Sequence, residues 1–319
     1  MRKLNHGLTL IELLVSLAIG LVIALAAASA YLGTRGAAIA TENSSRTNET
    51  GKLAMDYIGR EIQLAGFYPA QSPTNTTTIN TIGAFTNTKD PTKPSYNQGI
   101  FGCDGARFNA TASTCPSAVA NAPDSIVLNY FSSDVFETGT AAITGLMRDC
   151  NGTPATSDAA NNIRNAAVPR LPLYISNRIG LDATVYTSAN ASISTFSLAC
   201  AGNGGSGYQP IFEGIEDLVF RYGVYAGADS QSPERFYTAA EVGALPVSGD
   251  LTGWQRVTAV QVCMLVRSLD GSRLGAQGST AITYDNCRGG TTTYTSASRI
   301  AFKRFVRIFA ARNNLNSTN

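Results

Sequence analysis

Residues 8–33 read LTLIELLVSLAIGLVIALAAASAYLG, an uninterrupted apolar segment in which Glu12 is the only charged residue. An α-helix rises about 1.5 Å per residue, so a helix of this length reaches roughly 39 Å. That length exceeds the ~30 Å hydrocarbon core of a bilayer. The segment therefore predicts one membrane-spanning helix that is tilted or has one end among the lipid headgroups.

A short polar leader, Met1-Arg2-Lys3-Leu4-Asn5-His6-Gly7, precedes the apolar segment. Arg2 and Lys3 favour a cytoplasmic N-terminus, because basic residues flanking a span stay on that side. The residues after Arg35 are then expected on the far side of the inner membrane, where disulfides form.

The cysteine pattern agrees with this topology. All six cysteines lie beyond residue 100 and no two are spaced CxxC, so zinc-ribbon and thioredoxin motifs are absent. They are Cys103, Cys115, Cys150, Cys200, Cys263 and Cys287. An even number predicts up to three disulfides, and among about fifteen connectivities our hypothesis pairs neighbours along the chain. A free buried thiol at Cys263, which lies in a strongly apolar segment, is the alternative.

The acidic residue inside the apolar segment needs an explanation. A carboxylate at the centre of a span costs ~2.5–3.5 kcal/mol on insertion scales, and less near an end. Cleavage between Gly7 and Leu8 would create an α-amine one helical turn from Glu12. Glu12 of one chain could then reach the Leu8 amine of a neighbouring chain and fix its axial register, since opposite charges attract strongly in a low dielectric.

Two other interpretations of the N-terminus stay open. One is a secretory signal peptide with Ala28-Ser29-Ala30 as its cleavage site, so that the mature chain starts at Tyr31. The other is a signal anchor with no further role. Neither explains why an acidic residue lies five residues into the apolar segment.

The composition argues against an enzyme. The one histidine is His6, in the leader, so a processed chain has no imidazole for Ser-His-Asp hydrolysis, zinc ligation or acid–base steps. We therefore expect no catalytic residue, no cofactor and no metal. Lysine plus arginine total 24 against 22 for aspartate plus glutamate, so the chain carries no strong basic field for nucleic acid.

The sequence beyond the span predicts a helix followed by a sheet-rich head. Ala54, Ile58, Ile62 and Ala65 fall on one face of a helix over residues 46–66, and Gly66 ends it. The expected domains are a cleaved leader at 1–7, a transmembrane or fibre-core helix at 8–33, its amphipathic second half at 34–66, and a periplasmic or extracellular head at 67–319.

The head is expected to be α+β with a dominant sheet. Apolar runs predict strands within residues 125–131, 173–176, 191–198, 210–225 and 257–266. Residues 299–312 predict a strand or a helix, with Lys303, Arg304 and Arg307 on a solvated face. Polar residues 151–165 predict an exposed loop.

Residues 7–15, GLTLIELLV, resemble the class III signal of type IV prepilins and type II secretion pseudopilins. The resemblance implies that a prepilin peptidase of the inner membrane cuts after Gly7, that Leu8 is then N-methylated, and that Glu12 serves assembly. Leu8 stands where this family usually has phenylalanine. The chain also has no proline before Pro69, whereas major pilins commonly carry one in mid-span, so melting of the helix on assembly is not implied.

Three further segments resemble the PilW family of minor pilins, which is related to the J-type pseudopilin. They are PIFEGIEDLVFRYGV at 210–224, WQRVTAVQVCMLVRS at 254–268 and FKRFVRIFAARN at 302–313. The resemblance implies a type IV pilin-like α+β fold, with the long N-terminal helix packed on a wide β-sheet-rich globular head. It implies a single-pass inner-membrane subunit that later enters the pilus on the cell surface.

The functional role implied by this resemblance is structural. Such a minor pilin helps to prime pilus assembly and sits at or near the tip, with other minor pilins, the major pilin, the inner-membrane assembly platform and a PilY-type tip adhesin as partners. A J-type pseudopilin of a type II secretion system is the alternative. A DNA-uptake pilin is a weaker one, supported only by the basic residues within 299–312.

Overall fold

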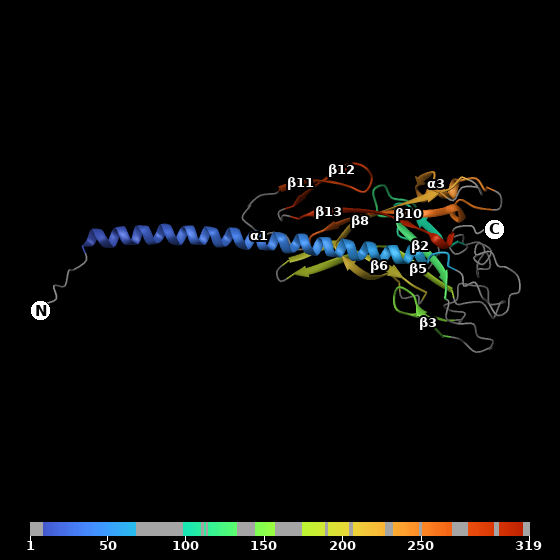
Figure 1. The fold of residues 1–319 in the computed structure, drawn as a ribbon, viewed down its shortest axis with the longest axis horizontal. Helices are drawn as coiled ribbons and strands as arrows, with labels where there is room; N and C mark the ends of the chain where they lie inside the picture. Colours follow the sequence, from blue (N-terminus) through green and yellow to red (C-terminus); the bar gives the residue numbers. More distant parts are fainter. Residues whose placement is uncertain are drawn as a thin grey trace.

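The computed structural model describes residues 9–67, 98–109, 112, 114–132, 144–156, 174–188, 191–203, 207–226, 232–248, 251–269, 280–296 and 300–314. One long helix, α1 (Leu10–Leu64), runs from a free N-terminal half into a head built of antiparallel sheets (Figure 1). The predicted α+β layout, a long apolar helix packed on a sheet-rich head, is confirmed.

Helix α1 is continuous over 55 residues. Its second half buries one stripe, formed by Ala54, Met55, Ile58 and Ile62, against the head. An apolar stripe at helical spacing must be covered by other apolar groups to leave water, so this stripe sets how the helix lies on the head. The helix ends before Gly66, which has a φ of 77° and whose N–H donates to the Asn129 carbonyl at 2.8 Å.

Two antiparallel sheets make up most of the head. The larger has the order β1-β2-β5-β6-β7 and the smaller the order β13-β10-β8-β9. The strands of the larger sheet are β1 (Ile100–Cys103), β2 (Ser125–Phe131), β5 (Tyr174–Ser188), β6 (Ala191–Ala201) and β7 (Gln209–Glu213). Those of the smaller are β8 (Ile215–Val224), β9 (Arg235–Tyr237), β10 (Val257–Arg267) and β13 (Phe302–Ala310).

Smaller elements decorate these sheets. Two hairpins pair β3 (Thr144–Arg148) with β4 (Pro154–Thr156), and β11 (Thr280–Asp285) with β12 (Thr291–Ser296). A short helix, α3 (Ala239–Ala244), and two 3-10 turns, η2 (Trp254–Arg256) and η3 (Arg312–Asn314), complete the described elements.

Gly214 carries the chain from one sheet to the other. Its N–H donates to the Phe196 carbonyl on β6 at 3.0 Å, and its own carbonyl accepts from Arg267 on β10 at 2.8 Å. Its φ is 78°, a backbone conformation that residues with a Cβ atom rarely adopt. The two sheets are therefore joined by backbone hydrogen bonds at this glycine, and both contribute to one core beneath α1.

The structure refines several local predictions. Within residues 299–312, predicted as a strand or a helix, Phe302–Ala310 form strand β13 and Arg312 begins the turn η3. Residues 154–156, predicted as part of an exposed loop, form β4, because their backbone pairs with β3 although their side chains give little strand signal. Residues 157–165 and 68–97 lie outside the described residues.

The six cysteines form three disulfides, Cys103–Cys115, Cys150–Cys200 and Cys263–Cys287. Each joins neighbours in the cysteine order, and none of the six thiols is free. The last bridge ties the turn of the β11–β12 hairpin to the central strand β10. Closing a loop of this kind stabilises a fold by ~2–4 kcal/mol, mainly by restricting the unfolded chain.

The contact between α1 and β13 is unusually close. The ring of Phe305 lies where a Cβ on Gly51 would be, and the ring of Phe309 lies where a Cβ on Gly59 would be. Glycine costs a helix interior about 1 kcal/mol relative to alanine. Here that cost is offset by two aromatic rings packed directly on the helix backbone.

We predict that Gly51→Ala and Gly59→Ala each lower the free energy of unfolding. The added methyl group must displace a half-buried aromatic ring, and overpacking of this kind costs about 1–3 kcal/mol, more than the helix propensity gained. Thermal unfolding of the full chain in detergent, followed by near-UV circular dichroism, measures the loss. Gly33→Ala is the matched control, because a Cβ there meets nothing within 4 Å. Equal stability of all three variants would contradict the packing argument.

Candidate assembly site along the long helix

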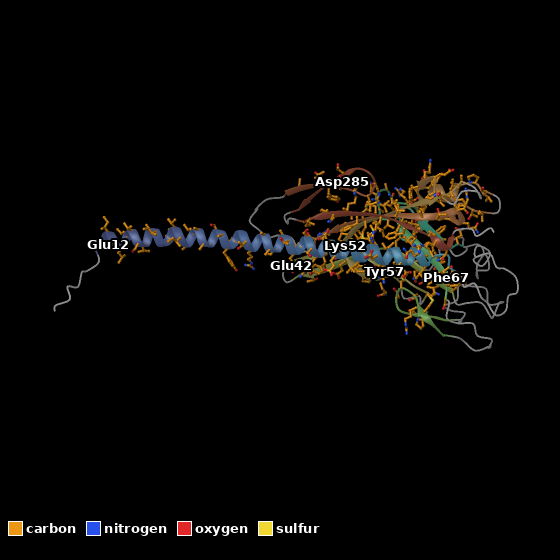
Figure 2. The ribbon with its side chains drawn as sticks, viewed as in Figure 1. Glu12, Glu42, Lys52, Tyr57, Phe67 and Asp285 are labelled. Carbon is orange, nitrogen blue, oxygen red and sulfur yellow. A yellow bond between two sulfur atoms is a disulfide. The ribbon has the colours of Figure 1, made fainter. Side chains whose placement is uncertain are left out.

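The first half of α1 is an unpaired apolar surface. Its large side chains are exposed from Leu10, at 79%, through Leu21, at 62%, to Leu32, at 54%. The helix contains a stretch long and apolar enough to cross a membrane, with no part of that stretch buried by the described residues. Figure 2 shows these side chains projecting on all sides of the ribbon, away from the head. Such a surface requires lipid or other apolar helices around it.

The predicted assembly residue Glu12 closes a capping box at the start of α1. The Thr9 hydroxyl accepts from the Glu12 N–H at 3.4 Å, while the Glu12 carboxylate accepts from the Thr9 N–H and hydroxyl, both at 3.2 Å. This arrangement satisfies N–H groups that the first helical turn leaves free, and it places a negative charge at the positive end of the helix dipole. The carboxylate is thus partly stabilised within its own chain.

The capping box assigns a role to Thr9 that our sequence analysis missed. The signal was present in the sequence, because a threonine followed three residues later by a glutamate is the pattern of a capping box. Gly7 and Leu8, the predicted cleavage and methylation residues, lie outside the described residues. Their relation to Glu12 therefore stays a prediction.

Polar contacts fix the second half of α1 along β13. Asp56 pairs with Arg307, and Asn48 accepts from Lys303. The Asp56 and Arg307 side chains are more than half exposed, so this ion pair stabilises by only ~0–1 kcal/mol. The prediction that Lys303, Arg304 and Arg307 form a solvated face is incomplete: they are exposed, yet two of them bind the helix.

A buried polar junction links α1 to the larger sheet. Asn177, which is fully buried on β5, donates to the Glu61 carboxylate at 2.7 Å and to the Tyr130 hydroxyl at 3.1 Å. The side-chain oxygen of Asn177, Oδ1, accepts from the Cys150 N–H at 3.0 Å. Burial raises the pKa of Glu61, and the Asn177 hydrogen bond opposes this shift. The helix is thus held to the head by a carboxylate that is costly to ionise.

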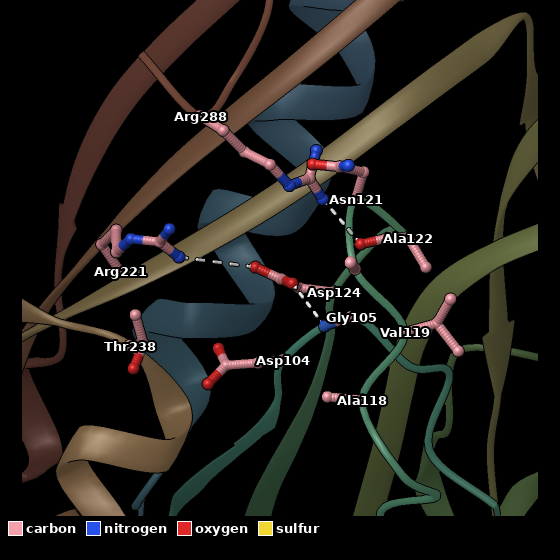
Figure 3. Close-up of a pocket in the computed structure, with 11 residues that line it drawn as sticks. Asp104, Gly105, Ala118, Val119, Asn121, Ala122, Asp124, Arg221, Thr238 and Arg288 are labelled. Atoms are coloured by element: carbon pink, nitrogen blue, oxygen red, sulfur yellow. Dashed lines mark hydrogen bonds and ion pairs between the residues drawn. The ribbon is translucent and has the colours of Figure 1, made fainter. Parts of the chain in front are cut away.

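A pocket of about 410 Å³ lies in the head between the segment around Val119 and the strand β8 (Figure 3). Asp124 forms its floor and accepts from the N–H groups of Gly105, at 2.8 Å, and Phe220, at 3.0 Å. The Arg221 guanidinium lies 3.6 Å from the same carboxylate. Burial raises the pKa of Asp124 to about 6, although these partners lower it.

Two further charged groups of the pocket, Asp104 and Arg288, also have structural partners. Asp104 accepts from the first two N–H groups of α3, at 2.9 and 2.7 Å. Arg288 donates to the Ala122 carbonyl at 2.6 Å and pairs with Asp217. These contacts tie three segments of the head together, and the pocket's polar groups thereby hold the fold. No group of three or more His, Cys, Asp or Glu side chains within the described ranges could hold a metal ion.

Two family models match the chain. Residues 2–28 match the prokaryotic N-terminal methylation motif, and residues 184–313 match the family of type IV pilus-assembly protein W. The first match spans the leader, Glu12 and most of the apolar segment, and the second runs from the β5–β6 hairpin through β13. Both resemblances predicted from the sequence are confirmed. Comparisons with curated proteins and with solved structures found no match.

The buried junction predicts a pH-dependent stability. The pKa of Glu61 is higher in the folded than in the unfolded chain. The stability that Glu61 contributes to the fold is therefore fully present below its unfolded pKa of ~4.3, and it is lost as the pH rises through the folded pKa. Glu61→Gln keeps an oxygen for Asn177 and removes the charge. We expect this variant to melt at a higher temperature than the parent at pH 7, with the gain disappearing near pH 4.

The control for this prediction is Glu49→Gln, an exposed position on the same helix. Removal of an exposed charge should change the free energy of unfolding by less than about 0.5 kcal/mol at either pH. A destabilised Glu61→Gln protein at pH 7, or a gain that persists unchanged at pH 4, would disprove the proposed cost of the buried carboxylate.

Proposed function

We propose that this chain, a type IV pilus-related minor pilin by its prepilin N-terminus and its PilW-type region, is a structural subunit that helps to prime pilus assembly and sits at or near the pilus tip. The observation that carries the proposal is the division of α1. One half presents an unpaired apolar surface with a capped carboxylate at its start, and the other half is fixed to a cross-linked head.

The proposed docking step uses the carboxylate of Glu12. In the membrane, the Thr9 capping box lowers the cost of this charge. Peptidase cleavage after Gly7 frees the Leu8 amine, which is methylated and stays cationic. In the fibre, the amine of a neighbouring subunit pairs with Glu12 in surroundings of low dielectric, where an unpaired carboxylate is strongly unfavourable. Subunits out of register would leave that charge alone, so pairing selects the axial position.

The apolar half of α1 supplies the contact area for this packing. Because lipid tails are as apolar as these side chains, this contact is favoured by close helix packing and the dispersion it adds, and not by removal of surface from water. Charge pairing and apolar contact thus have separate tasks: the first fixes register and the second supplies affinity. The cross-linked head keeps the subunit folded outside the membrane.

The proposal assigns no catalysis to the chain. In the pocket described above, the carboxylates and guanidinium groups already hold segments of the head, and the single histidine lies in the leader. The partners we propose are other minor pilins, the major pilin, the prepilin peptidase, the inner-membrane assembly platform and a PilY-type tip adhesin. The subunit would first be a single-pass protein of the inner membrane, with a periplasmic head, and then part of the pilus.

A J-type pseudopilin of a type II secretion system is the second candidate, because that class shares the prepilin signal. The match of residues 184–313 to the pilus-assembly family favours the pilus. Deletion of the gene separates the two functions. Lost surface pili with normal enzyme secretion supports our proposal, whereas lost secretion with normal pili would refute it.

We predict that the protein in sheared fibres starts at N-methylated Leu8. N-terminal mass analysis tests this directly, because methylation adds one CH₂ to the first residue after Gly7 is removed. A chain that starts at Tyr31 would instead establish a cleaved signal peptide, and the docking step would then have neither its amine nor its carboxylate.

A pair of Glu12 variants separates the charge from the helix cap. Glu12→Gln retains the capping box, since glutamine also serves at this position, but it cannot form an ion pair. We expect both Glu12→Gln and Glu12→Ala to be processed normally and to enter fibres about tenfold less than the parent, a loss of ~1.4 kcal/mol. Quantitative immunoblots of sheared fibres and membranes measure both steps.

Glu42→Gln is the matched control for the Glu12 variants. Glu42 lies on the same helix, beyond the apolar half. Its carboxylate pairs with the exposed Arg46 at 2.7 Å, a contact worth a few tenths of a kcal/mol. Its incorporation should equal that of the parent. If Glu12→Gln is incorporated normally and Glu12→Ala is not, the helix cap, and not the ion pair, governs docking.

A further inference from the structure

Strand β13 lies at an open edge of the smaller sheet. It pairs with β10 over nine consecutive residue pairs, from Phe302 to Ala310, with no shift of register. On its other side no strand among the described residues pairs with it. Long regular edge strands are uncommon in natural proteins, because they attract the backbone of other chains.

The register shows which backbone groups face the open edge. The Ala311 N–H donates to the Thr258 carbonyl and the Ala301 carbonyl accepts from the Ser268 N–H, so odd-numbered residues bond to β10. Successive residues of an antiparallel strand alternate in direction. The N–H and C=O groups of the even-numbered residues therefore point outward, and within 304–310 these residues are Arg304, Val306, Ile308 and Ala310.

The side chains of these even-numbered residues leave the open edge accessible. Val306 is 49% exposed and Ile308 is 56% exposed, on the face opposite α1. The β11–β12 hairpin covers only the beginning of the strand, where Tyr284 stacks on Phe302 at 4.2 Å and Asp285 pairs with Arg304 at 3.8 Å. Neither a proline nor a bulge interrupts β13. The stretch 304–310 is thus an open, regular edge with exposed apolar side chains.

The opposite face holds the strand rigidly in place. Phe305 and Phe309 pack on the backbone of α1 at Gly51 and Gly59, and Arg307 pairs with Asp56. Because β13 is already ordered, this protein loses little conformational entropy when another strand pairs with it, and this favours binding. The close helix contact therefore prepares β13 as a template for another strand.

We propose that the free edge of β13, residues 304–310, binds an extended acidic segment of a partner protein by strand addition. In this mode, backbone hydrogen bonds give affinity and alternate side chains give specificity. The charges select the partner. Four exposed cations lie on or next to the strand: Lys303, Arg304, Arg307 and Arg312. Asp285 pairs with Arg304 and Asp56 pairs with Arg307, which leaves a net charge of two positive units.

The same charges argue against pairing of two copies through this edge. Two β13 strands side by side would bring their arginines together, and like charges across a strand pair are destabilising. A segment that alternates acidic and apolar residues instead places its carboxylates near the cations and its apolar residues near Val306 and Ile308. This inference is independent of Glu12 docking, because the edge lies on the head and is tested without fibres.

The test uses the full chain in detergent micelles and a capped ten-residue peptide of alternating glutamate and valine as the probe. Hydrogen exchange, resolved to single residues, follows the amides of Val306 and Ile308. We expect fast exchange without peptide and at least about tenfold slower exchange at saturation, as for an amide that gains a hydrogen bond. The same peptide with alternate backbone N–H groups methylated, and a lysine-for-glutamate peptide, should not protect these amides.

Val306→Pro is the variant that blocks the edge. Proline is tolerated on an edge strand where its missing N–H faces solvent, so no hydrogen bond to β10 is lost. We expect the variant to keep a melting temperature close to that of the parent and to lose peptide binding. Val306→Thr, the matched control with an intact backbone, should bind within about threefold of the parent, because one side chain contributes well under 1 kcal/mol.

Several outcomes would overturn the proposal. Slow exchange of the Val306 and Ile308 amides without peptide would mean that the edge is already covered. If the N-methylated peptide binds as well as the parent peptide, or if the Val306→Pro protein binds as well as the parent protein, the peptide binds elsewhere or without strand addition. The comparison of the two peptides tests the proposal even if the proline variant does not fold. Protection that grows with protein concentration alone would assign the edge to a second copy.

Discussion

The structure depends on the packing of the second half of α1 into the head. Two glycines and a stripe of apolar residues on the helix pack against the head. The head contributes aromatic rings from β13 and aliphatic side chains from both sheets. The helix contacts strands of both sheets, β10 and β13 of the smaller and β2 and β7 of the larger. Loss of this contact would separate the anchor from the domain that it carries.

This packing gives the two halves of one helix opposite roles. The second half belongs to the core of the head, whereas the first half keeps every large apolar side chain exposed over a length sufficient for a bilayer. A continuous helix transmits the position of one half to the other with little flexibility. A contact that fixes the first half would therefore also set the orientation of the head.

Polar groups reinforce this design at a cost. The Glu61 carboxylate at the helix junction is half-buried and the Asp124 carboxylate at the pocket is buried, and burial raises the pKa of each. Each also connects separate segments through backbone or side-chain hydrogen bonds. Three disulfides add covalent links, one of which fixes the β11–β12 hairpin across the outer face of the smaller sheet. The head combines apolar burial with a small number of directional contacts that specify its arrangement.

The sequence by itself determined the features that depend on local pattern. The apolar run and its single acid predicted the exposed half of α1, the stripe around Ile58 predicted the half that packs, and the apolar runs predicted the principal strands. These signals are local because hydrophobic periodicity reflects burial directly. The capping box of Thr9 and Glu12 was equally local and could have been found.

Only the tertiary structure decided the features that depend on contacts between distant residues. A glycine in a helix does not indicate which aromatic ring packs against it, so the contact between Gly51 and Phe305 could not be predicted from the sequence. The link from Glu61 to Asn177 spans 116 residues, and no local pattern marks either residue as a partner. The open edge of β13 is also a property of strand order, since a strand is an edge only when nothing lies beside it in space.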